Sequence, residues 1–251
     1  MYKWRAIIFD LDDTLYLERD YVLSGFRAVA SWAETQIAIP AEEGYAALVR
    51  LFATGVRGNT FNEWLALYDQ PAKRVPELVT VYREHKPALR PFPGIPELLD
   101  ALRPHCALGL LGDGYLEVQR RKLTALGLAH CFDIVVFTDE FGRDAWKPDI
   151  RAFLTITDRL GVHATEAVYV GDNHLKDFLG ARRARMSTIC CRHPDSVYGH
   201  HAPPTAEHAA DFVVDSVAAL YTVLQDGRTP ISNDATMVEI EKMRRMERQI
   251  I

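Results

Sequence analysis

The stretch AIIFDLDDTL, residues 6–15, places four apolar residues directly before a group of carboxylates at Asp10, Asp12 and Asp13. A short apolar run of this kind is typical of a strand buried on both faces of a parallel sheet. In open parallel sheets, ligands bind outside the carboxyl ends of the strands, where loops from several strands meet. The stretch therefore predicts a buried strand with a functional site at its end.

Five further buried-strand patterns follow along the chain, at residues 107–111, 134–137, 167–170, 187–191 and 212–214. Helical patterns fill most of the intervals between them, which is the alternation of an α/β protein. We therefore expect an α/β fold whose core is a Rossmann-like, doubly wound parallel sheet.

One long interval breaks this alternation. It carries no good strand pattern and reads instead as successive amphipathic helices, at about 20–38, 41–54, 61–69 and 76–86. A crossover connection rarely needs so many residues, so this interval is expected to form its own small domain. The predicted organisation is an α/β core of residues 1–15 and 89–225, an inserted helical cap domain of residues 16–88, and a C-terminal part of residues 226–251.

The C-terminal part consists of a polar linker followed by the segment ATMVEIEKMRRMERQII. Its apolar residues lie roughly on one face of a helix, and Thr236 with Glu239 resembles a capping box. This pattern predicts an amphipathic helix that docks on the chain itself or forms a homodimer contact.

The composition excludes several classes of partner. The 251 residues carry a formal net charge of −5, which gives no basic surface for nucleic acid or for an anionic membrane. No apolar stretch reaches the length needed to cross a bilayer, and the four cysteines lack zinc-ligand or disulfide-scaffold spacing. We expect a cytoplasmic protein that acts on a small molecule.

Carboxylates, glycines and one ammonium group follow the predicted strands. Gly112, Asp113 and Gly114 come after the second strand, Asp172 and Asp177 come after the fourth, and Lys147 lies between the third and the fourth. Each residue alone is more often a turn former or a helix cap. Together, clustered carboxylates at Asp10, Asp12 and Asp172 would raise one another's pKa and favour a bound cation, and an all-oxygen ligand set suits Mg²⁺.

The motifs FDLDDTL (9–15), GDG (112–114), Lys147 before a proline, and GDNHLKD (171–177) resemble those of the haloacid dehalogenase-like superfamily. The similarity is to phosphatase-type members that carry a helical cap between the first two motifs, and it covers about residues 4–224. It implies a Mg²⁺-dependent phosphomonoester hydrolase that acts on a small soluble phosphate, such as a sugar or sugar-acid phosphate.

The resemblance also implies a role for each matching residue. Asp10 would be the nucleophile that becomes an aspartyl-phosphate, and Asp12 would be the general acid and then the general base. The Mg²⁺ ligands would be the carboxylates of Asp10 and Asp172 and the backbone carbonyl of Asp12. Phosphate would be bound by Gly112, Asp113, Gly114 and Lys147. The residues expected to support these groups from outside are Asp177, Asn173 and Thr14.

Two positions refine this interpretation. The dehalogenases of the superfamily lack an acid at the position of Asp12, because a halide leaves without a proton, so Asp12 favours phosphoryl transfer. Asp13 is interpreted as a surface or capping acid.

Gly112 stands where family members usually carry a serine or threonine whose hydroxyl contacts the phosphate. The missing hydrogen bond to a charged group is worth about 1.5–3 kcal/mol. This corresponds to a loss of roughly ten- to a hundred-fold in rate. The sequence therefore predicts that Gly112→Thr raises activity.

Two alternatives remain open at this stage. A phosphomutase would use the same residues but move the phosphate instead of releasing it. A catalytically attenuated protein would bind a phosphometabolite or a partner chain, through the C-terminal helix in the latter case.

Overall fold

The computed structural model describes residues 2–198 and 201–227, and its contacts divide the chain into two compact units. The first unit contains Met1–Leu17 and the chain from Arg90 onward, and the second is Glu18–Leu89. The second unit begins two residues later and ends one residue later than the insert expected from the sequence. The predicted C-terminal helix, and the homodimer contact proposed for it, lie outside the described residues.

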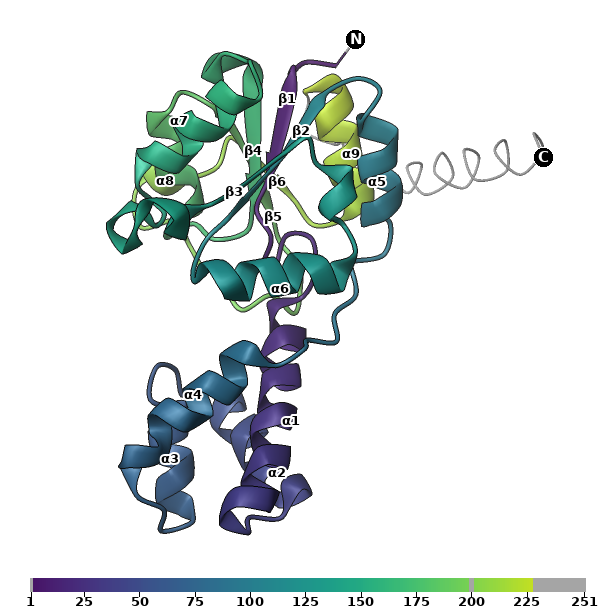
Figure 1. Cartoon of the computed structure of the whole chain (residues 1–251). Coiled ribbons are helices and arrows are strands. Elements are labelled where there is room, and N and C mark those ends of the chain that lie inside the picture. The colour runs from purple at the N-terminus through teal and green to yellow at the C-terminus, as the bar shows by residue number, and fades with distance from the viewer. Residues whose placement is uncertain (1, 199–200, 228–251) are drawn as a thin grey trace, which may run out of the picture. The chain divides into compact units, whose positions relative to one another are not determined.

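The first unit is built on a six-stranded sheet in the order β3-β2-β1-β4-β5-β6, with every neighbouring pair parallel (Figure 1). The strands are β1 (Ala6–Phe9), β2 (Ala107–Gly112), β3 (Ile134–Phe137), β4 (Ala167–Gly171), β5 (Ser187–Cys191) and β6 (Phe212–Val214). In the register, Phe9 of β1 lies opposite Leu110 of β2 and Val170 of β4. Because these three strands are parallel and aligned, the residues that follow them emerge at one edge of the sheet.

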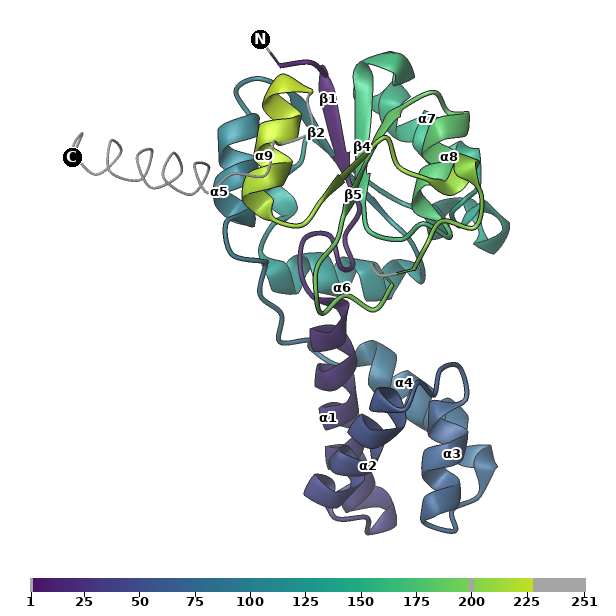
Figure 2. The same ribbon diagram turned by 180° about the vertical axis from the view of Figure 1, so that it is seen from behind.

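Helices cover both faces of this sheet, as expected for a doubly wound fold. Helices α7 and α8 lie on one side, and α5 and α9 lie on the other (Figures 1 and 2). The helices of this unit are α5 (Ile95–Leu102), α6 (Leu116–Leu126), α7 (Ile150–Arg159), α8 (Asp177–Arg183) and α9 (Val217–Asp226). Short 3₁₀ turns complete it: η2 (Ala129–Cys131), η3 (Thr138–Phe141), η4 (Arg143–Ala145), η5 (Ala164–Glu166) and η6 (Ala206–His208). This arrangement confirms the predicted α/β class.

The packing explains why the strand sequences are uniformly apolar. All four residues of β1 are fully buried, since the sheet is covered on both faces. On the side of α7 and α8, Ile8 and Tyr169 pack with Phe153, Ile156 and Phe178. Rigid strands buried in this way hold the backbone at their ends in fixed positions.

The second unit consists of helices only, within the described residues. Its elements are α1 (Glu18–Ile37), α2 (Ala41–Ala53), α3 (Thr60–Leu67), η1 (Ala72–Arg74) and α4 (Val75–Glu84), close to the ranges expected from periodicity. Trp64 lies in its core with Phe26, Leu48 and Leu78, and its indole N–H donates to the Gly44 carbonyl at 2.9 Å. The unit therefore has a hydrophobic core of its own.

Among the helices of the described chain, none combines the length and the apolar character that a membrane span requires.

Candidate active site

The end of β1 brings Asp10 against the ammonium group of Lys147. Lys147 donates hydrogen bonds to the carboxylate of Asp10, to the Tyr169 hydroxyl and to Oδ1 of Asp177, the last at 3.1 Å. These contacts use all three N–H groups of the ammonium. The Lys147 side chain has no exposed surface, and Asp10 is 3% exposed. The Lys147–Asp10 contact joins residues that are 137 positions apart in the chain, and the role expected for Lys147 in catalysis stays a prediction.

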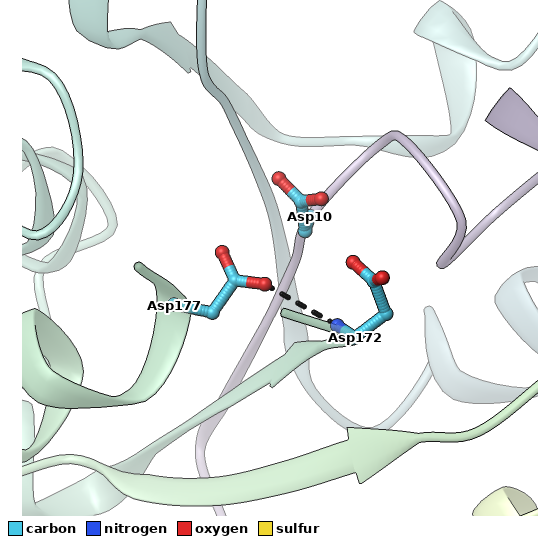
Figure 3. Close-up of side chains that lie close together, drawn as sticks. All are labelled: Asp10, Asp172 and Asp177. Carbon is cyan, nitrogen blue, oxygen red and sulfur yellow. Dashed lines mark hydrogen bonds between the residues drawn. The ribbon is translucent and has the colours of Figure 1, made fainter. Parts of the chain in front are cut away.

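Three carboxylates meet beside this lysine: those of Asp10, Asp172 and Asp177 (Figure 3). Their ligand atoms lie within 4.8 Å of one another, and all three residues are buried. Figure 3 shows the three side chains turned toward a common space, from β1, from the end of β4 and from the start of α8. This is the convergence at one sheet edge that the strand-end acids predicted.

Burial and mutual repulsion disfavour the charged forms of these acids. Burial raises the pKa of Asp10 to about 7, with a further contribution from Asp177, although Lys147 opposes both. Burial also raises the pKa of Asp172 well above its ordinary value, and Asp177 and Asp10 add to this. The single positive charge of Lys147 therefore does not neutralise the negative charge of the three carboxylates.

The cluster fits a bound cation. Oδ2 of Asp172 is buried and has no hydrogen-bond partner among the residues that the structure describes, so this acid retains an unsatisfied buried acceptor. Buried, closely spaced carboxylate oxygens are the donor set that hard divalent cations take. Both oxygens of Asp177 already accept hydrogen bonds, so Asp10 and Asp172 are the side chains that could hold such an ion.

Asp177 is held by several donors. Its Oδ2 accepts from the backbone N–H groups of Asn173, at 2.9 Å, and of Asp172, at 3.3 Å. Gly171 permits this approach, because a Cβ at that position would lie 2.7 Å from Oδ2 of Asp177. Asp177 thereby holds the loop that carries Asp172, and its expected supporting role at a metal site stays a prediction.

Asp113 connects three of the sequence motifs through its side chain. Its Oδ1 accepts from the Thr138 hydroxyl at 2.7 Å and from the Lys147 backbone at 3.0 Å, and its Oδ2 accepts from Lys176 Nζ at 3.2 Å. Burial acts to raise the pKa of Asp113, but the ammonium groups of Lys176 and Lys147 outweigh it, so the pKa is lowered. The carboxylate is therefore engaged in structural contacts. If Asp113 contacts a phosphate, it does so through its backbone N–H group.

Gly112 is the last residue of β2 and faces Phe137, its partner in β3. A Cβ at this position would lie 2.9 Å from Cδ1 of Phe137 and 3.0 Å from Oε1 of Gln119. The space that a serine or threonine would need is thus already filled. This adds an obstacle to Gly112→Thr that the sequence does not reveal.

The carboxylate of Asp12 is not part of the three-acid cluster. Lys122 Nζ lies 2.7 Å from Oδ1 and 2.8 Å from Oδ2, Gln119 Nε2 lies 3.1 Å from Oδ2, and the Tyr16 hydroxyl also donates to Oδ1. Burial acts to raise the pKa of Asp12, but Lys122 and then Tyr16 and Gln119 outweigh it, and the pKa is lowered. The grouping of this carboxylate with those of Asp10 and Asp172, expected from the sequence, is wrong, because donors on α6 and Tyr16 hold it elsewhere. The backbone carbonyl of Asp12 as a metal ligand stays a prediction.

Three neighbouring polar residues can be placed plainly. Asp13 is 1% exposed and accepts the Val197 N–H at 2.6 Å, so its interpretation as a surface or capping acid is wrong. It has a positive φ of 52°, which aspartate tolerates better than most residues. Thr14 is buried, and its hydroxyl has no hydrogen-bond partner in the described part of the chain. Asn173 accepts the Leu175 N–H at 2.9 Å through its side-chain oxygen.

Several residues that touch the site were not singled out from the sequence: Tyr16, Gln119, Lys122, Thr138, Tyr169 and Lys176, the last of which lies inside the motif GDNHLKD. A signal existed for two of them. Gln119 and Lys122 lie on the buried face of α6 together with Leu123 and Leu126. The buried face of an amphipathic helix normally carries apolar residues. A polar residue on an apolar stripe can therefore mark a site.

Comparisons with known proteins agree with this geometry. The family model for haloacid dehalogenase-like hydrolases matches residues 7–191. The glyceraldehyde 3-phosphate phosphatase of Methanopyrus kandleri is 32% identical over 88% of this chain and 97% of its own. The phosphoserine phosphatase of Thermus thermophilus is 35% identical over 64% of this chain and 61% of its own. The crystal structure of a HAD phosphatase from Thermococcus onnurineus has a TM-score of 0.58 and 26% identity, over 90% of this chain and 100% of that one.

These matches confirm both the resemblance found in the motifs and the expectation of a phosphatase. The family model spans most of the chain, from β1 to β5, and includes every strand end that contributes to the site. The chain therefore belongs to the haloacid dehalogenase-like hydrolase family.

Proposed function

We propose that this protein is a Mg²⁺-dependent phosphomonoester hydrolase that uses Asp10 as its nucleophile and acts on a small phosphate ester. The observation that carries the proposal is the placement of Asp10 at the end of β1, paired with buried Lys147 and next to Asp172 and Asp177. A carboxylate at a rigid strand end is an oriented nucleophile.

In this proposal Asp10 attacks phosphorus, and the leaving oxygen takes a proton from Asp12. Water then attacks the phosphorylated Asp10, and Asp12 takes up a proton from that water. Lys147 offsets negative charge on Asp10 and on the phosphoryl oxygens, and backbone N–H groups at Asp113 and Gly114 bind the phosphate. Mg²⁺, held by Asp10, Asp172 and the Asp12 carbonyl, would neutralise the charge of the incoming phosphate.

Several finer features belong to the same proposal. Asp177, Asn173 and Thr14 support the metal and the loop that carries it, and the helical unit acts as the cap that selects the substrate. The names of the relatives point to three-carbon phosphates such as glyceraldehyde 3-phosphate and phosphoserine as first candidates. The four cysteines are free thiols, as is usual in a reducing compartment, which supports a cytoplasmic location.

The test is release of inorganic phosphate from a panel led by glyceraldehyde 3-phosphate and phosphoserine, with added sugar, sugar-acid, polyol and nucleotide phosphates. Native protein and Asp10→Asn are compared with and without Mg²⁺. Release that requires Mg²⁺ and is lost in Asp10→Asn supports the proposal. Transfer of phosphate to a second position without release would indicate a mutase, and no turnover by folded protein would contradict an active phosphatase.

A further inference from the structure

The carboxylate of Asp12 is enclosed by donors from one helix and one turn. Lys122 donates to both carboxylate oxygens, Gln119 donates to Oδ2, and Tyr16 donates to Oδ1. Contacts from an ammonium group to both oxygens of a carboxylate restrict its rotation as well as its position. Asp12 is therefore held in one orientation by several partners at once.

The residues that hold it are buried side chains of α6. Lys122 is 4% exposed and Gln119 is 2% exposed, and their spacing of three residues places them on the same helical face. Burying an ammonium group is unfavourable unless it is paired and hydrogen-bonded, and hydrophobic residues at such a position are often as stabilising. Fold stability therefore does not require a lysine here, whereas its contacts to both oxygens of Asp12 suit control of that carboxylate.

Gln119 also faces the phosphate-binding turn. Its Nε2 donates to Asp12, which fixes the direction of the amide, and within residues 2–198 and 201–227 its buried Oε1 has no hydrogen-bond partner. That oxygen lies 3.0 Å from the position that a Cβ on Gly112 would occupy. The amide thus lies between Asp12 and the second motif, next to the place where the phosphate is expected.

We propose that Lys122, assisted by Gln119, is a positioning residue that directs Asp12 toward the leaving oxygen of the substrate. The proposal rests on the proposed function, because Asp12 has this task only if a phosphate ester is cleaved. When the P–O bond breaks, its electron pair stays on the leaving oxygen, which takes the proton from Asp12. Lys122 keeps its own protons throughout and contributes through its contacts to Asp12.

The experiment compares two substrates of similar size, phenyl phosphate and p-nitrophenyl phosphate. Phenolate is a basic leaving group that needs a proton, whereas p-nitrophenolate leaves without one. The measured quantity is kcat/KM, which reports the steps up to departure of the leaving group. For Lys122→Met we expect a loss of roughly a hundred-fold on phenyl phosphate and of at most about three-fold on p-nitrophenyl phosphate.

Three further variants of α6 separate position from charge and from folding. Arg120→Met removes a cation from the same helix, but its guanidinium pairs with exposed Glu117, so both substrates should be hydrolysed as by the native protein. Lys122→Arg keeps the charge and the donors and should recover part of the activity on phenyl phosphate. Gln119→Leu changes no charge and should show a smaller loss with the same dependence on the leaving group.

The outcomes are distinguishable. Equal losses on both substrates in Lys122→Met and Gln119→Leu would overturn the positioning role, because a general structural defect does not sense the leaving group. In an Asp12→Asn background, Lys122→Met should have no further effect on phenyl phosphate, and a full additional loss would also overturn it. If thermal denaturation shows that Lys122→Met is unfolded, the comparison of kcat/KM on the two substrates is made with Gln119→Leu instead, and equal losses there overturn the positioning role. If native protein hydrolyses neither aryl ester nor any member of the panel, the proposed function itself fails.

Discussion

Replacement of Gly112 tests whether the missing hydroxyl at the end of β2 limits catalysis. The useful pair is Gly112→Ala and Gly112→Ser, since both add the same Cβ and only serine adds the hydroxyl. That Cβ would lie 2.9 Å from Phe137 Cδ1 and 3.0 Å from Gln119 Oε1, closer than ordinary van der Waals contact. Phe137 is buried, so the ring has little room to move. Overpacking of this kind reduces the free energy of unfolding by about 1–3 kcal/mol.

The activity of the two variants should differ although their stability does not. A hydroxyl that donates to a phosphate oxygen contributes about 1.5–3 kcal/mol. We therefore expect kcat/KM of Gly112→Ser to exceed that of Gly112→Ala by roughly ten- to a hundred-fold. Relative to native protein the gain is smaller, because the added Cβ also disturbs the Gln119 amide that contacts Asp12.

Urea denaturation gives the stability change, and phosphate release from the best ester of the panel gives kcat/KM. Equal kcat/KM for the alanine and serine variants would refute the missing-contact reasoning. A Gly112→Ala protein as stable as the native one would refute the steric reasoning, and would mean that Phe137 or Gln119 relaxes freely.

Three other predictions concern the buried charges, the acid range and the helical unit. Lys147→Met should abolish phosphate release and reduce the free energy of unfolding by about 3–5 kcal/mol, because the buried carboxylates lose their cation; urea denaturation checks this. The pKa of the Asp113 carboxyl is lowered in the folded state. Native protein should therefore have a larger free energy of unfolding than Asp113→Asn above pH 3.8, the ordinary pKa, and this difference should disappear as the pH falls below that value. Denaturation of both proteins across pH 2–6 tests this sign. Trp64→Phe leaves the Gly44 carbonyl without its buried donor and should reduce stability by about 1–3 kcal/mol, with no change in the kcat of phosphate release.

The fold class and the position of the site followed from the sequence, because both depend on local patterns. The run before Asp10 is buried on both faces of the sheet, and the corresponding runs form all six strands within a residue of the expected ranges. The insert was visible as a long interval with helical periodicity. Acids after strands converge because parallel strands end at one edge, so Asp10 and Asp172 could be grouped from the sequence. The sequence placed Asp12 with them, whereas the structure places Asp177 there.

The partners of those acids were decided only by the tertiary structure. Lys122 is 110 residues from Asp12 and Lys176 is 63 residues from Asp113, and no local period connects such pairs. The crowding at Gly112 and the burial of Asp13 also depend on the side chains that pack around them, from β3, α6 and the loop after β5. Periodicity shows which face of an element is buried, whereas the packing of distant segments determines which atoms meet there. For this reason the sequence by itself located the carboxylates, and only the folded chain showed which donors hold them.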